Sequence, residues 1–303
     1  MNQEFIRWRA SLSNYSYEYS AVVRDVSDEA KYMTEHGRDS FDVSSGRFLT
    51  ERLSQIDSDT DRYSLWAWDG EHSYAIERLL RHRSVNSLDA ALSVPGRITA
   101  SLGDSPKASR VLLSRVLTGG GLPRSPELQK KENMVFQASV INGTNLVHLI
   151  FGIGRLNVEI DSLSGNPTSI YSVSEYPDVG VVKNYDYLFG EWGNVDGIQI
   201  PLTITERMLI LDTSDGHACP KLPIQYRKKT YKLIKGTVKV NINFRNQAFQ
   251  PKLPVGTVVY NQITGARYTV ENEGPLVESE ARIEQRLEEL IEEAKRDEGA
   301  VGE

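Results

Sequence analysis

The residue types that could bind a metal or attack a substrate are few and widely spaced in this chain. None of the five histidines forms a spaced pair with another histidine, as a zinc site would require. His217 and Cys219 are close in sequence, but one such pair falls far short of a metal site. Nucleophilic catalysis through Cys219 would need an activating base, and the sequence identifies none. We therefore predict no metal site and no catalytic cysteine. The histidines are His36, His72, His82, His148 and His217.

Acidic residues are abundant enough for other kinds of site. Asp57, Asp59 and Asp61 resemble part of a calcium loop, but the glycine and the distal glutamate of such a loop are missing. A solvated hairpin tip is the better interpretation. The sequence contains no Gly-x-Ser-x-Gly motif, and the run of three glycines at 119–121 lacks the Lys-Ser/Thr of a phosphate-binding loop. These observations favour a non-enzymatic protein without a cofactor.

The net charge of −6 comes entirely from the C-terminal tail. Residues 278–303 contain ten acidic and four basic residues, so residues 1–277 are neutral. A neutral body is a poor general nucleic-acid binder, because neutralising phosphates needs a surplus of Lys and Arg. Two basic clusters could contact phosphates or anionic head groups at a membrane surface, although a solvated sheet face or rim is favoured for both. They are Arg78, Arg81, His82 and Arg83, and Arg227, Lys228, Lys229, Lys232 and Lys235.

Cysteine usage and the N-terminal residues leave the compartment open. A single cysteine excludes an intrachain disulfide, which fits a cytoplasmic protein and equally a bacterial exported protein without bridges. Residues Met1–Arg9 contain no apolar signal core, and no run of the sequence approaches membrane-spanning length. The chain is therefore expected to be either cytoplasmic or the mature body of a longer precursor.

The elements that must position these residues are mostly strands. In residues 237–244 every second residue is apolar, which is the two-residue period of a strand with one dry face and one wet face. Segments 156–160 and 198–205 repeat this pattern. Such strands predict one large curved sheet with apolar material against its dry face. The apolar residues of the first segment are Val238, Val240, Ile242 and Phe244.

Helical patterns interrupt the strands at three main places. Ser87–Leu92 predicts a short helix. Pro106–Leu117 has a proline in its first turn, a wide apolar stripe and three glycines after its end, so we expect a helix that is buried on one side. Ser279–Lys295 has apolar residues at spacings of three and four and predicts an acidic amphipathic helix.

Four local features resemble the LolA-type half-barrel family of bacterial lipoprotein and lipid carriers. They are the strand Ser44–Arg52, the hairpin Leu65–Tyr74, the strand-turn-strand unit Leu156–Ser172 and the edge Asn194–Pro201. The order of elements also agrees, since a helix, long antiparallel strands, an inserted helical pair and further long strands follow one another. The resemblance extends roughly over Phe5–Phe244.

This resemblance implies a mainly β fold with α: one large curved antiparallel sheet, an incomplete β-barrel covered on its concave face by short helices, plus a C-terminal helix. We expect a half-barrel domain over residues 1–245, a C-terminal β-hairpin extension over 246–275, and an acidic amphipathic helix and tail over 276–303. The family would also imply a bacterial, periplasmic or otherwise extracytoplasmic protein. A cytoplasmic location is the alternative.

The expected function is the non-enzymatic binding of a lipid or lipoprotein acyl chain in an apolar half-barrel cavity. A protein-interaction or scaffold module is the alternative, in which the helices fill the cavity permanently and the C-terminal helix recruits a partner. The partners implied are a lipid or an acylated protein. The candidate ligand-binding residues are Trp66, Trp68, Phe136, Val147, Leu149, Phe151, Leu156, Val158 and Ile200, and the candidate lid residues are Val111, Leu112 and Val116.

Overall fold

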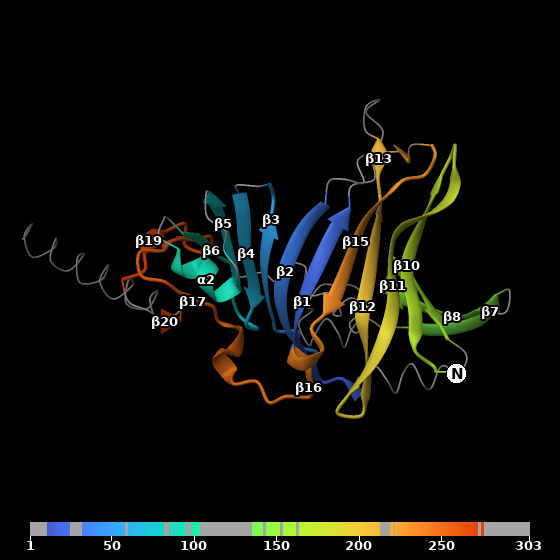
Figure 1. Cartoon of the computed structure of the whole chain (residues 1–303), viewed down its shortest axis with the longest axis horizontal. Coiled ribbons are helices and arrows are strands. Elements are labelled where there is room, and N and C mark those ends of the chain that lie inside the picture. Colours follow the sequence, from blue (N-terminus) through green and yellow to red (C-terminus); the bar gives the residue numbers. More distant parts are fainter. Residues whose placement is uncertain are drawn as a thin grey trace, which may run out of the picture.

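One sheet of 16 strands makes up most of the protein (Figure 1). Its two end strands are not neighbours of each other, so the sheet is open. The computed structural model describes residues 11–24, 32–57, 60–81, 85, 87–94, 98–103, 135–141, 144–151, 154–161, 164–212, 219–220, 222–271 and 274–275. The expectation of a mainly β protein with one large, unclosed sheet is confirmed.

The strands follow one another in two meanders and a C-terminal set. The first meander is β1 (Asn14–Arg24), β2 (Tyr32–Asp42), β3 (Phe48–Gln55), β4 (Thr60–Trp68), β5 (Ser73–Arg81) and β6 (Thr99–Gly103), with helix α2 (Leu88–Ser93) between β5 and β6. The second is β7 (Val135–Ile141), β8 (Thr144–Phe151), β9 (Gly154–Ile160), β10 (Pro167–Tyr176), β11 (Gly180–Val195) and β12 (Ile198–Leu209). The C-terminal set is β15 (Tyr226–Leu233), the 3-10 helix η1 (Lys235–Thr237), β16 (Lys239–Val240), the 3-10 helix η2 (Asn246–Phe249), β18 (Val258–Asn261) and β19 (Arg267–Thr269).

Strand β15 joins the two meanders into one sheet. The order across the sheet is β19-β18-β6-β5-β4-β3-β2-β1-β15-β12-β11-β10-β9-β8-β7, with β16 paired to β1. Within this order β18 lies parallel to β6, and the other pairs are antiparallel. Two small two-stranded sheets complete the described strands: β13 (Leu211–Asp212) with β14 (Cys219–Pro220), and β17 (Lys252–Leu253) with β20 (Gly274–Pro275).

The sheet has a separate apolar core on each of its faces. Tyr15, Tyr17 and Tyr19 of β1 mark one face, called here the tyrosine face, where a buried cluster extends across β1, β15, β12, β10 and β9. The second cluster lies on the opposite face of β3–β6, because Leu65 and Ile76 alternate along their strands with tyrosine-face residues such as Trp66. Strands β3–β6 of the first meander therefore carry buried apolar side chains opposite the tyrosine face as well as apolar residues on it.

Helix α2 forms where the sequence predicts it, but it lies on the face opposite Trp66 and Trp68. Ser87 caps its first turn by accepting a hydrogen bond from the Ala90 amide at 3.2 Å. Ala91 is buried in the cluster opposite the tyrosine face. The expected helical cover of the face that carries the two tryptophans is therefore not supported by the described residues. The helices expected at 106–117 and 279–295 lie outside them, and so do the lid residues Val111, Leu112 and Val116.

The alternating segment 237–244 does not form one long strand as the sequence predicts. Val238 and Val240 are buried against the tyrosine face, as expected, but β16 ends at Val240. Asn241 has a positive φ of 51°, which takes the backbone out of the extended conformation. Its side-chain oxygen accepts a hydrogen bond of 2.8 Å from the Ser13 amide, and its side-chain nitrogen donates one of 2.8 Å to the Ser11 carbonyl. These bonds explain why the strand stops there.

Candidate functional site

The tyrosine face changes character along the strands, from an apolar end to an ionic end. Register pairs arrange its residues in rows across the first meander. The row farthest from the C-terminal end of β1 is apolar, because Tyr15 pairs with Phe41 and Phe48 pairs with both Phe41 and Trp68. Tyr15, Phe41 and Phe48 are each at most 1% exposed. The ring centroids of Tyr15 and Phe41 are 5.6 Å apart, which is normal aromatic packing.

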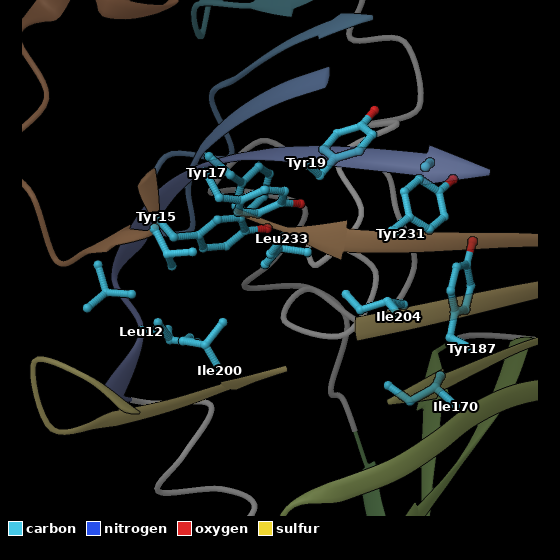
Figure 2. Packing of buried hydrophobic residues seen from close by; sticks show 14 of the residues in the cluster. Leu12, Tyr15, Tyr17, Tyr19, Ile170, Tyr187, Ile200, Ile204, Tyr231 and Leu233 are labelled. Carbon is cyan, nitrogen blue, oxygen red and sulfur yellow. The ribbon is translucent and has the colours of Figure 1, made fainter. Parts of the chain in front are cut away.

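The same apolar end continues onto β12 and β15. Ile200 and Leu233 belong to the same buried cluster as Tyr15 and lie near it in Figure 2. Figure 2 also shows Tyr17 and Tyr19 following Tyr15 along β1, with Tyr231 and Tyr187 beyond them. The hydroxyl groups of these four tyrosines meet carboxylates, and this distinguishes the other end of the face.

Asp39 occupies the second row, beside Tyr17 in the strand register. Its carboxylate accepts a hydrogen bond of 2.8 Å from the Tyr17 hydroxyl and one of 2.5 Å from the Thr50 hydroxyl. The side chain is completely buried. Burial and the charge of Asp39 raise the pKa of Tyr17 well above its usual value, so this phenol remains a proton donor. Tyr17 and Asp39 therefore form a buried, hydrogen-bonded polar pair in the middle of the tyrosine face.

Glu35 holds the ionic end of the face together. It accepts hydrogen bonds from the Tyr19 hydroxyl at 3.0 Å, from the Ser54 hydroxyl at 3.0 Å and from the Lys229 ammonium at 2.7 Å. Burial alone would raise the pKa of Glu35, but the nearby charges of Lys229 and Arg52 outweigh it, so the pKa lies below its usual value. Glu35 is therefore a buried carboxylate that stays ionised beside two cations.

Glu206 extends the ionic end to β11 and β12. Its two carboxylate oxygens accept hydrogen bonds from the hydroxyl groups of Tyr187, at 2.8 Å, and Tyr231, at 2.9 Å. Burial and Glu206 raise the pKa of Tyr231 well above its usual value. The Lys229 ammonium lies 4.7 Å from the centre of the Tyr231 ring, within range for a cation-π contact. Lys229 thus connects the Glu35 and Glu206 groups across the sheet.

Gly37 is the position that makes room for this arrangement. A Cβ atom on Gly37 would come within 2.1 Å of the Tyr19 ring, so only glycine allows the ring to lie flat over β2. From there Tyr19 reaches Glu35 and contacts the Tyr231 ring edge-on, with 5.4 Å between the ring centroids. The absence of a side chain at Gly37 therefore allows the Tyr19 hydroxyl to reach Glu35.

The predicted ligand-binding residues fall into two sets. Val158 and Ile200 are buried in the tyrosine-face cluster, and Trp66 and Trp68 are partly buried against it. The others are on β7, β8 and β9, where the structure describes the backbone but not these side chains. The register pairs Phe136 with Leu149, Leu149 with Leu156, Val147 with Val158, and Phe151 with Gly154.

The sequence reasoning missed the polar half of the site. The phase of β1 places Tyr15, Tyr17 and Tyr19 on a buried face, and Glu35 and Asp39 fall in the phase of Phe41 on β2. A charged residue in the dry phase of a strand was the signal that could have identified them. The basic clusters also need correction, because Arg78 and Lys229 are largely buried rather than solvated. Each of them is held by a partner group: α2 carbonyls for Arg78 and Glu35 for Lys229.

The described residues contain no group of three side chains that could hold a metal ion. None of the helices in the described ranges is long and apolar enough to cross a membrane.

No protein-family model matches the sequence, and no curated protein matches it either. Among solved structures, the chain is similar to a LolA superfamily protein from Nitrosomonas europaea, with 7% identity, a TM-score of 0.44, and 82% of this chain and 97% of that one covered. It is also similar to a β-barrel-like protein of a domain of unknown function from Brucella abortus, with 11% identity, a TM-score of 0.30, and coverage of 77% and 99%. These likenesses concern the fold, and at such TM-scores they carry no argument about what this chain binds.

Proposed function

We propose that this chain is a non-enzymatic binding protein that holds a lipid or a lipoprotein acyl chain against the tyrosine face. The observation that carries the proposal is the division of that face into an apolar end and an ionic end. An amphiphilic molecule has the same division. In this arrangement the acyl tail lies toward Phe48, Trp68 and Ile200, and the polar end lies toward Glu35 and Lys229.

The energetics favour this orientation over the reverse one. Each methylene group moved from water into an apolar site contributes about 0.8 kcal/mol, so the tail supplies most of the affinity. Near Glu35, Lys229 and Glu206 the same tail would displace hydrogen-bonded charges, which is costly when a partner is lost. A polar group of the ligand meets charges and hydroxyl groups there. The ionic end thus sets the direction of the ligand.

The lid and the compartment are part of the same proposal. We place the lid on residues 106–117, with Val111, Leu112 and Val116 toward the acyl chain, because an apolar face of this size needs a cover when no ligand is bound. A carrier of acyl chains has its use between membranes, so we propose an extracytoplasmic, periplasmic location.

Native mass spectrometry of protein purified without detergent tests the proposal, together with uptake of a fluorescent fatty acid. We expect bound lipid in the spectrum and saturable uptake. The variant Trp68→Ala should weaken uptake about tenfold, because it removes a large apolar side chain from the apolar end. Tyr260→Ala is the matched control, since Tyr260 is an aromatic residue on β18 that is 48% exposed. Absence of both bound lipid and uptake would refute the proposal.

A further inference from the structure

Exposed apolar side chains collect at one end of the sheet. Thirteen large hydrophobic residues are exposed in the described part of the chain, and at least nine of them lie toward the end where β1 finishes and β2 begins. Scattered single exposures are ordinary, but such a concentration at one end is not. Figure 1 shows this end at the top, where β10, β11 and β13 also end or turn. We call it the apolar rim and define it by Val22, Met33, Val173, Val181, Met208 and Leu222.

The most exposed members of the rim belong to the second meander and to the segment before β15. Val181 is 68% exposed and Leu222 is 65% exposed. The rim residues come from five different strands and one connecting segment, so they are spread across the ends of these strands instead of forming one compact patch. A folded protein partner would need a matching series of separate pockets. A fluid bilayer needs no such match, because each side chain can insert between lipids independently.

Basic residues occupy the centre of the same rim. Arg24 pairs with Lys228 across β1 and β15, and Arg227 pairs with Met208 across β15 and β12. All three basic residues are exposed. Two of them belong to the C-terminal basic cluster of the sequence, of which Lys229 alone points into the ionic end. Positive charge among apolar side chains is complementary to anionic head groups over hydrocarbon.

We propose that the apolar rim docks on the surface of an anionic lipid bilayer. The apolar side chains enter the boundary between head groups and acyl chains, and Arg24, Arg227 and Lys228 contact the head groups. The inference does not require a ligand on the tyrosine face. Docking through the rim would turn the ionic end of the tyrosine face toward the membrane, because this ionic end lies at the same end of the strands as the rim.

Flotation of the full chain with vesicles tests the proposal. The vesicles contain equal parts of phosphatidylglycerol and phosphatidylcholine, with pure phosphatidylcholine vesicles as the uncharged comparison. We expect the chain to bind the anionic vesicles, and the triple variant Val173→Ser, Val181→Ser, Leu222→Ser to bind at least tenfold more weakly. The matched control is Ile234→Ser, Tyr260→Ser, Ile263→Ser, which removes three exposed apolar residues away from the rim and should leave binding unchanged.

A second pair of variants tests the charges. Replacing Arg24, Arg227 and Lys228 with Gln should reduce binding to anionic vesicles at least tenfold and remove most of its salt dependence. Replacing Lys232, Lys235 and Lys239, which are exposed but away from the rim, should have a much smaller effect. Thermal unfolding of every variant confirms that it is folded.

Three results would overturn the proposal. The first is a wild-type chain that does not bind the anionic vesicles, and the second is an equal loss of binding in the rim and control variants. The third is self-association that disappears in the apolar triple variant without any vesicle binding, since the rim would then contact a second copy of the chain. Fatty-acid uptake measured on the same variants keeps the two proposals apart, because the rim variants should retain it.

Discussion

Replacing Gly37 with alanine should disturb the ionic end through a single methyl group. The new Cβ would lie 2.1 Å from Cζ, 2.3 Å from the hydroxyl oxygen and 2.4 Å from Cε1 of Tyr19. Contacts this short are impossible, so the Tyr19 ring must move. When it moves, its hydrogen bond of 3.0 Å to Glu35 and its edge contact with Tyr231 are both lost.

The size of the effect follows from these two losses. Overpacking in a well-packed core costs about 1–3 kcal/mol, and a broken buried hydrogen bond to a charged group costs about 1–3 kcal/mol. We expect Gly37→Ala to lower the free energy of unfolding by about 3 kcal/mol. Because the entropy of unfolding grows with chain length, a chain of 303 residues should then lose about 5 °C in Tm. Differential scanning calorimetry and urea unfolding measure the two quantities.

Gly190→Ala is the matched control, because Gly190 also lies inside a strand but a Cβ there would meet nothing within 4 Å. That variant should be neutral or gain about 0.5 kcal/mol from reduced backbone entropy in the unfolded chain. In a Tyr19→Ala background the cost of Gly37→Ala should largely disappear, since the clashing ring is gone. An unchanged Tm for Gly37→Ala, or an equal cost in both backgrounds, would refute the reasoning.

The other predictions concern two buried charges. Lys229 and Arg52 hold the pKa of Glu35 below its usual value of 4.5. The ionised form of Glu35 therefore stabilises the fold fully above pH 4.5, and this contribution is lost as the pH falls through the lower pKa of the folded state. Glu35→Gln should therefore lower the free energy of unfolding by about 3 kcal/mol at neutral pH. Urea unfolding at a series of pH values should show this loss of stability shrinking below pH 4.5. A loss of stability that is independent of pH would contradict this account. Arg78→Met should cost about 2–4 kcal/mol and speed hydrogen exchange in α2, because Arg78 donates to the carbonyls of Ala91, at 2.9 Å, and Val94. The exposed Arg62→Met on β4 should be near neutral, and an equal effect of both substitutions would argue against a role for the α2 carbonyls.

Strands were predictable from the sequence wherever alternation continued without interruption. The alternating segment 198–205 lies in strand β12, which continues to Leu209, and the short helix expected over Ser87–Leu92 is α2. The segment 237–244 misled the prediction, because its alternation is real but Asn241 adopts a left-handed conformation that local pattern does not reveal. Periodicity reports which face a residue occupies, and it does not report where hydrogen bonding between strands ends.

The apolar half of the candidate site was accessible to sequence reasoning, and the ionic half was not. Trp66 and Ile200 were expected on a dry face because of their type and phase, and both belong to the tyrosine-face cluster or pack against it. Glu35 and Lys229 are 194 residues apart in the chain, and they meet only because β1 lies between β2 and β15. Strand order is a long-range property, so the partner of a buried charge could not be read from its neighbours in sequence.

The position of β15 has a consequence for how the chain is assembled. This strand pairs with β1 on one side and with β12 on the other, so both meanders depend on it for their connection. Until Tyr226–Leu233 has been synthesised, the two halves can exist only as separate sheets, with β1 and β12 as unpaired edges. Exposed edges of this length promote pairing with other chains. Completion of a strand near the C-terminal end of synthesis therefore decides whether two aggregation-prone half-sheets become one protein.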